Sequence, residues 1–128
     1  RVEKIFYNNT LIAIRTKRFK KGIIPLTDPL QSLQVVIHKR KVSSYTKAHM
    51  HKSVERVTQN LQECLVVIKG KMKIDLFASD NKFFKSIYVS AGQTVIFISG
   101  GHAVRILEDA ELIEVKNGPF IEDKVFIE

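Results

Sequence analysis

Residues 63–76, which read ECLVVIKGKMKIDL, decide the fold of this chain. Glu63 heads an apolar run, residues 64–68, and this stretch of strand length ends at Gly70. After it, Met72, Ile74 and Leu76 alternate with polar residues, which is the period of a strand with one buried face. The stretch therefore predicts two β-strands separated by a turn at Gly70.

The same pattern of short apolar or alternating runs between turn residues continues in both directions along the chain. We expect further strands at 11–14, 33–37, 83–89, 94–98, 102–107 and 112–115, and a short one at 125–127. No segment shows a long helical period. Eight or more strands at this spacing predict an all-β fold, and we expect a double-sheet jelly roll.

Size and composition limit the class of protein. The 128 residues predict one domain, and 45% hydrophobic with 27% charged residues is ordinary for a globular protein. No apolar run approaches the roughly 18 to 20 residues that a membrane helix needs, so we expect no membrane partner. Cys64 is the single cysteine and excludes an intrachain disulfide, which predicts a cytoplasmic location and a small buried hydrophobic role for this residue.

The net charge of +8 lies in the first half of the chain. Residues 1–64 carry 13 Lys and Arg against 4 Asp and Glu, and residues 65–128 carry 8 against 9. Such an excess attracts anions, including acidic small molecules. A solvated face explains most of these residues equally well. Because no zinc finger, helix-turn-helix or RNA-binding pattern accompanies the charge, we expect no nucleic-acid partner.

Three histidines and one glutamate form a candidate metal site. His49 and His51 point the same way if they lie in a strand, because residues i and i+2 share a face. Glu63 opens the apolar run, and His102 follows a Gly-Gly pair. Imidazole and carboxylate ligands together suit one divalent transition metal, Fe, Mn, Ni or Zn. Glu55 is the alternative carboxylate, but it lies outside the apolar run.

These residues resemble the metal-binding motifs of the cupin superfamily. The chain has the H-x-H pair at 49–51, and Glu63 is followed by Gly70 after six residues, as in the first cupin motif. Gly92, Gly100 and His102 are similar to the second motif. The resemblance covers about residues 33–116 and implies a double-stranded β-helix, the cupin jelly-roll barrel. It divides the single domain, 1–128, into N-terminal strands or an arm at 1–32, a barrel core at 33–116 and a C-terminal segment at 117–128.

The match departs from the family pattern in its spacing. Eleven residues separate His51 from Glu63 where the motif has three or four, so residues 52–62 would form an enlarged loop. Ile98 and Ile106 stand where the second motif has proline and asparagine. A narrower resemblance is to small bacterial cupins that carry a G-G-H element and an E-V-K-x-G-P-aromatic ending, here at 100–102 and 114–120. Their activity is unsettled.

The narrower resemblance hints at sugar chemistry. It implies a metal-binding cupin that acts on a sugar or sugar nucleotide as an isomerase or epimerase in surface-polysaccharide metabolism. An Fe(II) dioxygenase and a non-catalytic module that binds a sugar or organic acid are the alternatives. The catalytic base is not identified, and Glu114, Lys116, Asp123 and Lys124 are expected to form surface ion pairs. We also expect a homodimer in which residues 5–7 and 11–14 pair with the sheet of a second copy.

Overall fold

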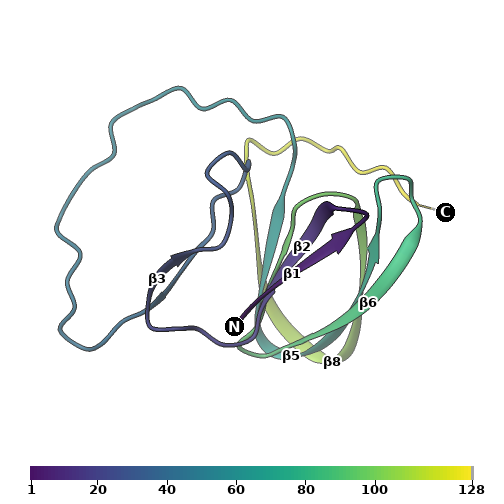
Figure 1. Cartoon of the computed structure of the whole chain (residues 1–128), viewed down its shortest axis with the longest axis horizontal. Coiled ribbons are helices and arrows are strands. Elements are labelled where there is room, and N and C mark those ends of the chain that lie inside the picture. Colours follow the sequence, from purple (N-terminus) through teal and green to yellow (C-terminus); the bar gives the residue numbers. More distant parts are fainter. Residues whose placement is uncertain (128) are drawn as a thin grey trace.

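Strand β5, Glu63–Phe77, organises the sheet in the computed structural model, which describes residues 1–127 (Figure 1). It pairs antiparallel with three other strands: β6 (Phe83–Ser90), β7 (Thr94–Phe97) and β8 (Gly101–Lys116). The first residues of β5 lie between β7 and β8, and its second half lies between β6 and β8. One long strand therefore holds together the part of the chain that follows residue 62.

The N-terminal strands extend this sheet. β1 (Val2–Tyr7) and β2 (Thr10–Thr16) form a hairpin, and β2 also pairs with β7, which gives the order β1-β2-β7-β5-β6 with β8 on β5. β3 (Gly22–Pro25) and β4 (Val36–Lys39) form a separate two-stranded sheet. The described residues are all-β without a helix, and the antiparallel sheet curls strongly into a half-barrel (Figure 1).

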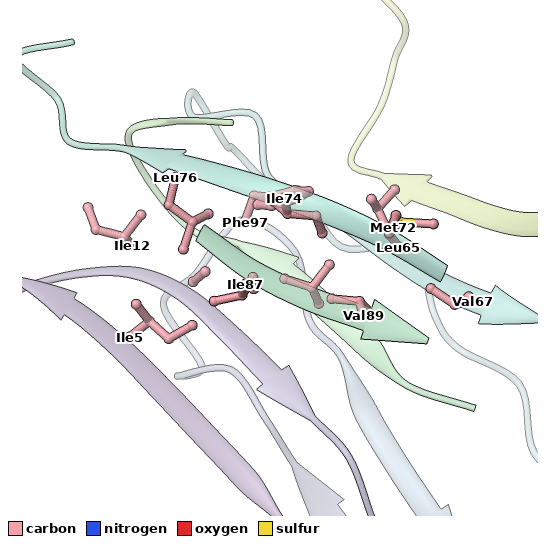
Figure 2. Close-up of a cluster of buried hydrophobic side chains, with 12 residues drawn as sticks. Ile5, Ile12, Leu65, Val67, Met72, Ile74, Leu76, Ile87, Val89 and Phe97 are labelled. Carbon is pink, nitrogen blue, oxygen red and sulfur yellow. The ribbon is translucent and has the colours of Figure 1, made fainter. Parts of the chain in front are cut away.

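The hydrophobic core lies on the concave side of this sheet. Figure 2 shows its main cluster, in which Met72, Ile74 and Leu76 of β5 pack with side chains from β1, β2, β6 and β7. These three side chains are fully buried. A second cluster joins the other face of the sheet to the β3–β4 hairpin and includes Ile14, Ile96 and Cys64. The alternation predicted for residues 72–76 is therefore confirmed.

The turn predicted at Gly70 is wrong, because β5 continues through it. Opposite Gly70, β8 likewise continues through residues 108–110, where we expected a break between two strands. The β5–β8 register shifts at this level. Gly70 has a φ of +89°, and a Cβ there would lie 2.3 Å from the carbonyl oxygen of Asp109. The residues that suggested turns therefore form facing irregularities at which both strands bend together.

Two other strand predictions need correction. The strand expected at 33–37 begins only at Val36, and residues 125–127 carry no strand. Strand β3 was not predicted, because only two apolar residues lie between Gly22 and Pro25. Residues 5–7 and 11–14, which we expect to pair with a second copy, pair with each other in the β1–β2 hairpin, and the outer edge of β1 has no partner strand within residues 1–127. No helix within residues 1–127 is long and apolar enough to cross a membrane.

Candidate functional site

Glu63 and His102 meet at one end of the curled sheet. The Nε2 atom of His102 lies 3.1 Å from Oε1 of Glu63. Their register partners on the β5–β8 ladder are Lys116 and Leu76, so the two residues lie at opposite ends of that ladder. The curl of the sheet brings the two ends together. Two of the four residues predicted from the sequence as metal ligands therefore form a close pair.

Aromatic and cationic side chains surround this pair. The ring of Phe97, the register partner of Glu63 on β7, stacks on His102 with centroids 3.7 Å apart and planes inclined by 5°. Nζ of Lys116 lies 3.8 Å from Oε2 of Glu63 and 3.2 Å from Oε2 of Glu114. Phe97 thus fixes the plane of the imidazole, and the two oxygens of Glu63 have different neighbours.

The environment favours a neutral imidazole on His102. Burial lowers the pKa of His102 below its usual value, although the charges of Glu63 and Glu114 oppose this effect. The hydrogen bond and charge of Glu114 raise the pKa of Lys116, which therefore stays protonated. A neutral histidine next to a carboxylate can accept or donate a proton near neutral pH.

A cavity of about 530 Å³ opens beside the pair. Residues 97–103 form part of its wall, and the C-terminal segment from Phe120 to Ile127 forms much of the rest. Lys116 lies 5.6 Å from the ring centroid of Phe120. A Cβ on Gly101 would approach the side chain of Ile127 to 2.5 Å, so this glycine lets the C-terminal segment pack closely. The volume suits a small molecule.

The charges of the cavity wall nearly balance. Three carboxylates, those of Glu63, Glu122 and Asp123, face two amines, those of Lys116 and Lys124. This balance sets no strong preference for the sign of a ligand's charge. The strongly basic residues of the first half of the chain do not line the cavity.

A buried glutamine fixes the position of Glu63. The side chain of Gln62 is buried, and its Oε1 accepts a hydrogen bond of 3.0 Å from the backbone N–H of Leu33. Its Nε2 donates to Oε1 of Gln31 at 2.6 Å, and its backbone N–H donates to Oδ1 of Asn117 at 2.9 Å. The first residue of β5 is therefore held from three directions.

His49 and His51 lie elsewhere, on segment 40–62, which contains no strand and is exposed from residue 40 to residue 61. Their ring centroids are 5.0 Å apart, so the two imidazoles are neighbours as predicted, but not through a strand. Nδ1 of His49 lies 2.7 Å from the carbonyl oxygen of Lys47. Glu55 is on the same exposed segment. The structure thus contains two separate pairs, 49 with 51 and 63 with 102.

The donors present at the cavity do not fit the predicted four-ligand metal site. One carboxylate and one imidazole meet there, and within residues 1–127 no group of three His, Cys, Asp or Glu side chains is placed to hold a metal ion. A transition-metal site in a protein needs three or four such ligands. The predicted four-ligand site forms only if segment 40–62 moves toward the cavity or if a second copy supplies its two histidines.

Cys64 follows Glu63 in β5 and points to the opposite face of the sheet, away from the cavity. It is 3% exposed and belongs to the second core cluster. Burial raises the pKa of its thiol to about 11, so the thiol stays protonated at neutral pH. The prediction of a small buried hydrophobe is confirmed.

Sequence reasoning missed the cavity residues contributed by the C-terminal segment. Lys116, which we expected in a surface ion pair, pairs with Glu114 and also reaches Glu63. Phe120 was noted only as part of a motif, although it lines the cavity. The one available signal was the antiparallel pairing of residues 63 and 116, which cannot be obtained from strand periods alone.

Comparison with known proteins gives no match to a family model, to a curated protein or to a solved structure. The evidence on function is therefore the geometry of residues 1–127. That geometry consists of an all-β half-barrel with a histidine–glutamate pair beside a cavity.

Proposed function

We propose that this chain is a single-domain cupin jelly roll whose Glu63–His102 cavity binds a sugar or sugar nucleotide and catalyses an isomerisation or epimerisation. The observation that carries the proposal is the 3.1 Å contact between His102 Nε2 and Glu63 Oε1 beside a cavity of about 530 Å³. A cytoplasmic role in surface-polysaccharide metabolism is part of the proposal through the sequence resemblance.

The reaction needs only proton transfer. A base removes the proton from a hydroxyl-bearing carbon next to a carbonyl group, and the electron pair forms an enediolate. For isomerisation, the hydroxyl proton passes to the former carbonyl oxygen and a proton returns to the former carbonyl carbon. For epimerisation, a proton returns to the opposite face of the original carbon. Glu63 and His102 supply a carboxylate and an imidazole for these two transfers, and the ammonium of Lys116 stabilises negative charge on an oxygen.

The residues around the pair hold it for this task. Phe97 fixes the imidazole plane, and Gln62 fixes the start of β5. The C-terminal segment covers part of the cavity and limits access of water. No step is assigned to a metal ion, because only two of the four predicted ligands meet.

Deuterium exchange tests the proposal directly. Candidate keto sugars and their nucleotide derivatives are incubated with the protein in deuterium oxide, and NMR follows deuterium at the carbon next to the carbonyl. We expect exchange with the native protein and a rate lower by about 10²–10⁴-fold for Glu63→Gln or His102→Gln, because general acid–base catalysis contributes that much.

Glu111→Gln is the matched control, because Glu111 lies on β8 away from the cavity wall. It should exchange at the native rate. Ligand-induced thermal stabilisation without exchange would contradict catalysis and leave the non-catalytic binding module as the function.

A further inference from the structure

Strand β8 has an unpaired edge. It pairs with β5 from Lys116 to Gly101, and no strand within residues 1–127 pairs with its other edge. None of its 16 residues is buried. A long exposed edge offers unpaired N–H and C=O groups to another strand.

Both faces of β8 also expose apolar side chains. Neighbouring strand residues point to opposite faces, yet Ile106 and Leu107 are 50% and 46% exposed, and Leu112 and Ile113 are 37% and 53% exposed. A strand whose two faces and one edge are all open is unusual in a folded domain. β8 therefore lacks a partner that would cover it.

Segment 40–62 is the second unpartnered part of the chain. It extends away from the sheet in Figure 1 and contains no strand. Val42 and Met50 are 95% and 94% exposed. Irregular segments longer than about 12–15 residues are uncommon in compact domains unless they bind something.

One end of this segment is tied to the residue that follows β8. Near the start, Nη1 of Arg40 donates to Oγ1 of Thr46 at 2.5 Å, which is a tie within the segment itself. Near the end, Nδ2 of Asn117 donates to the carbonyl oxygen of Asn60 at 3.2 Å and to Oγ1 of Thr58 at 3.3 Å. Residues 47–57 between the two ties form an outward arm that carries His49 and His51.

The arm and β8 have opposite charges. Within residues 47–57 there are three cations and one carboxylate, whereas β8 carries four carboxylates and two cations. Charge pairs across neighbouring strands stabilise the pairing and select its partner. Eleven extended residues span about 36 Å, so the arm is long enough to follow most of β8.

We propose that the arm, residues 47–57, of a second copy of this chain pairs with the free edge of β8, and that its His49 and His51 thereby reach the Glu63–His102 cavity. Within one chain the segment that contains the arm extends away from the sheet (Figure 1), which leaves the free edge of β8 open to the arm of a second copy. A two-fold exchange gives each copy one arm and covers each β8, so the assembly closes as a dimer. The part about the cavity rests on the proposed function of that cavity.

Crosslinking between two differently labelled chains tests this exchange. In a Cys64→Ala background, His51→Cys chains are mixed with Ala103→Cys chains, and a short bismaleimide is added. Ala103 follows His102 in the cavity wall, so we expect a covalent dimer that contains one chain of each kind. The matched control replaces Ala103→Cys by Tyr88→Cys, since Tyr88 is on β6, across β5 from β8, and should give no crosslink.

Sedimentation at micromolar concentration supplies the second measurement. We expect a dimer for the native chain and a monomer when a short Gly-Ser linker replaces residues 47–57. A native monomer, an intrachain crosslink in the double variant His51→Cys/Ala103→Cys, or equal crosslinking to the two sites would overturn the proposal. Neither measurement depends on activity, so a failure of the proposed reaction would leave both results unchanged.

Discussion

The two partners that flank the second half of β5 differ in how they are covered. β6 lies on one side and contributes Ile87 and Val89 to the core, whereas β8 lies on the other side without a buried residue. Both are hydrogen-bonded to β5 along their length. The difference shows that ladder pairing forms a strand, while burial requires a further layer that β8 lacks within one chain. We call the β6 side of β5 the closed side and the β8 side the open side, and His102 of the Glu63–His102 pair lies on β8.

The largest expected effect is on metal binding. The Glu63–His102 pair becomes a complete metal site only if His49 and His51 of a second copy join it. We expect purified, tag-free protein to carry about one divalent transition metal per chain and His51→Ala to carry none, because three imidazoles and a carboxylate make a complete site. Elemental mass spectrometry gives the metal content. His38→Ala is the control, since His38 lies on β4 outside the predicted site, and it should retain the metal.

An absence of metal in all three proteins, after Fe(II), Mn(II), Ni(II) and Zn(II) have been supplied, would contradict this prediction. The two pairs would then remain separate in solution, as they are within residues 1–127.

Core truncation compares the two sides in terms of stability. Ile74→Ala removes a fully buried side chain of β5 and should lower the free energy of unfolding by about 2–5 kcal/mol. Ile113→Ala on β8 removes a side chain that is 53% exposed and should cost less than about 1 kcal/mol in a monomer. Denaturant unfolding measures both values. A loss at Ile113 that matches Ile74 and depends on protein concentration would show that β8 is covered by a second copy.

The sequence predicted the closed side of the molecule better than the open side. The alternation of Met72, Ile74 and Leu76 reports burial on one face, and that burial exists within the chain. Residues 102–107 and 112–115 have similar apolar content, so the sequence predicts strands there too, and β8 includes both. Strand periods do not specify which strand lies beside which, so they could not show that β8 has an open edge.

The residues of the candidate site also differ in how well the sequence predicted their positions. Glu63 and His102 were predicted together and lie together, because both are fixed on strands of one ladder. The prediction for His49 and His51 assumed a strand, but residues 40–62 have none in this chain. Phe97 and Lys116 became visible as site residues only through the register and the curl of the sheet.

Gly92 and Gly100 allow the cost of an unfavourable backbone conformation to be compared with the added cost of a close contact. Gly100 has a φ of +73°, and a Cβ there would lie 2.1 Å from the carbonyl oxygen of Phe77. Gly92 has a φ of +85° and no heavy atom within 4 Å of the Cβ position. We expect Gly92→Ala to cost about 1 kcal/mol from backbone strain and Gly100→Ala about 3 kcal/mol, because the backbone at Phe77 must also shift. Thermal and denaturant unfolding would give both values, and equal losses would mean that the cavity wall next to Gly101 tolerates movement.

The smallest expected effect is a pH dependence that belongs to the closed side. Burial raises the pKa of the Cys64 thiol from 9.0 to about 11. Between these values the unfolded chain loses the thiol proton while the folded chain keeps it, so the stability from the buried thiol is complete below pH 9 and falls as the pH rises toward 11. The contribution to the slope is at most about 1.4 kcal/mol per pH unit.

Cys64→Ala isolates this contribution from that of the other titratable groups of the chain. We expect denaturant unfolding between pH 8 and pH 11 to give a shallower decline for the variant than for the native protein, and a thiol reagent to modify the native protein only as fast as it unfolds. Rapid modification of the folded protein at neutral pH would show that the second cluster opens. In that case the closed side of the sheet would be less rigid than its buried side chains indicate. The closed side and β8 would then both open to solvent and would differ only in how often they do so.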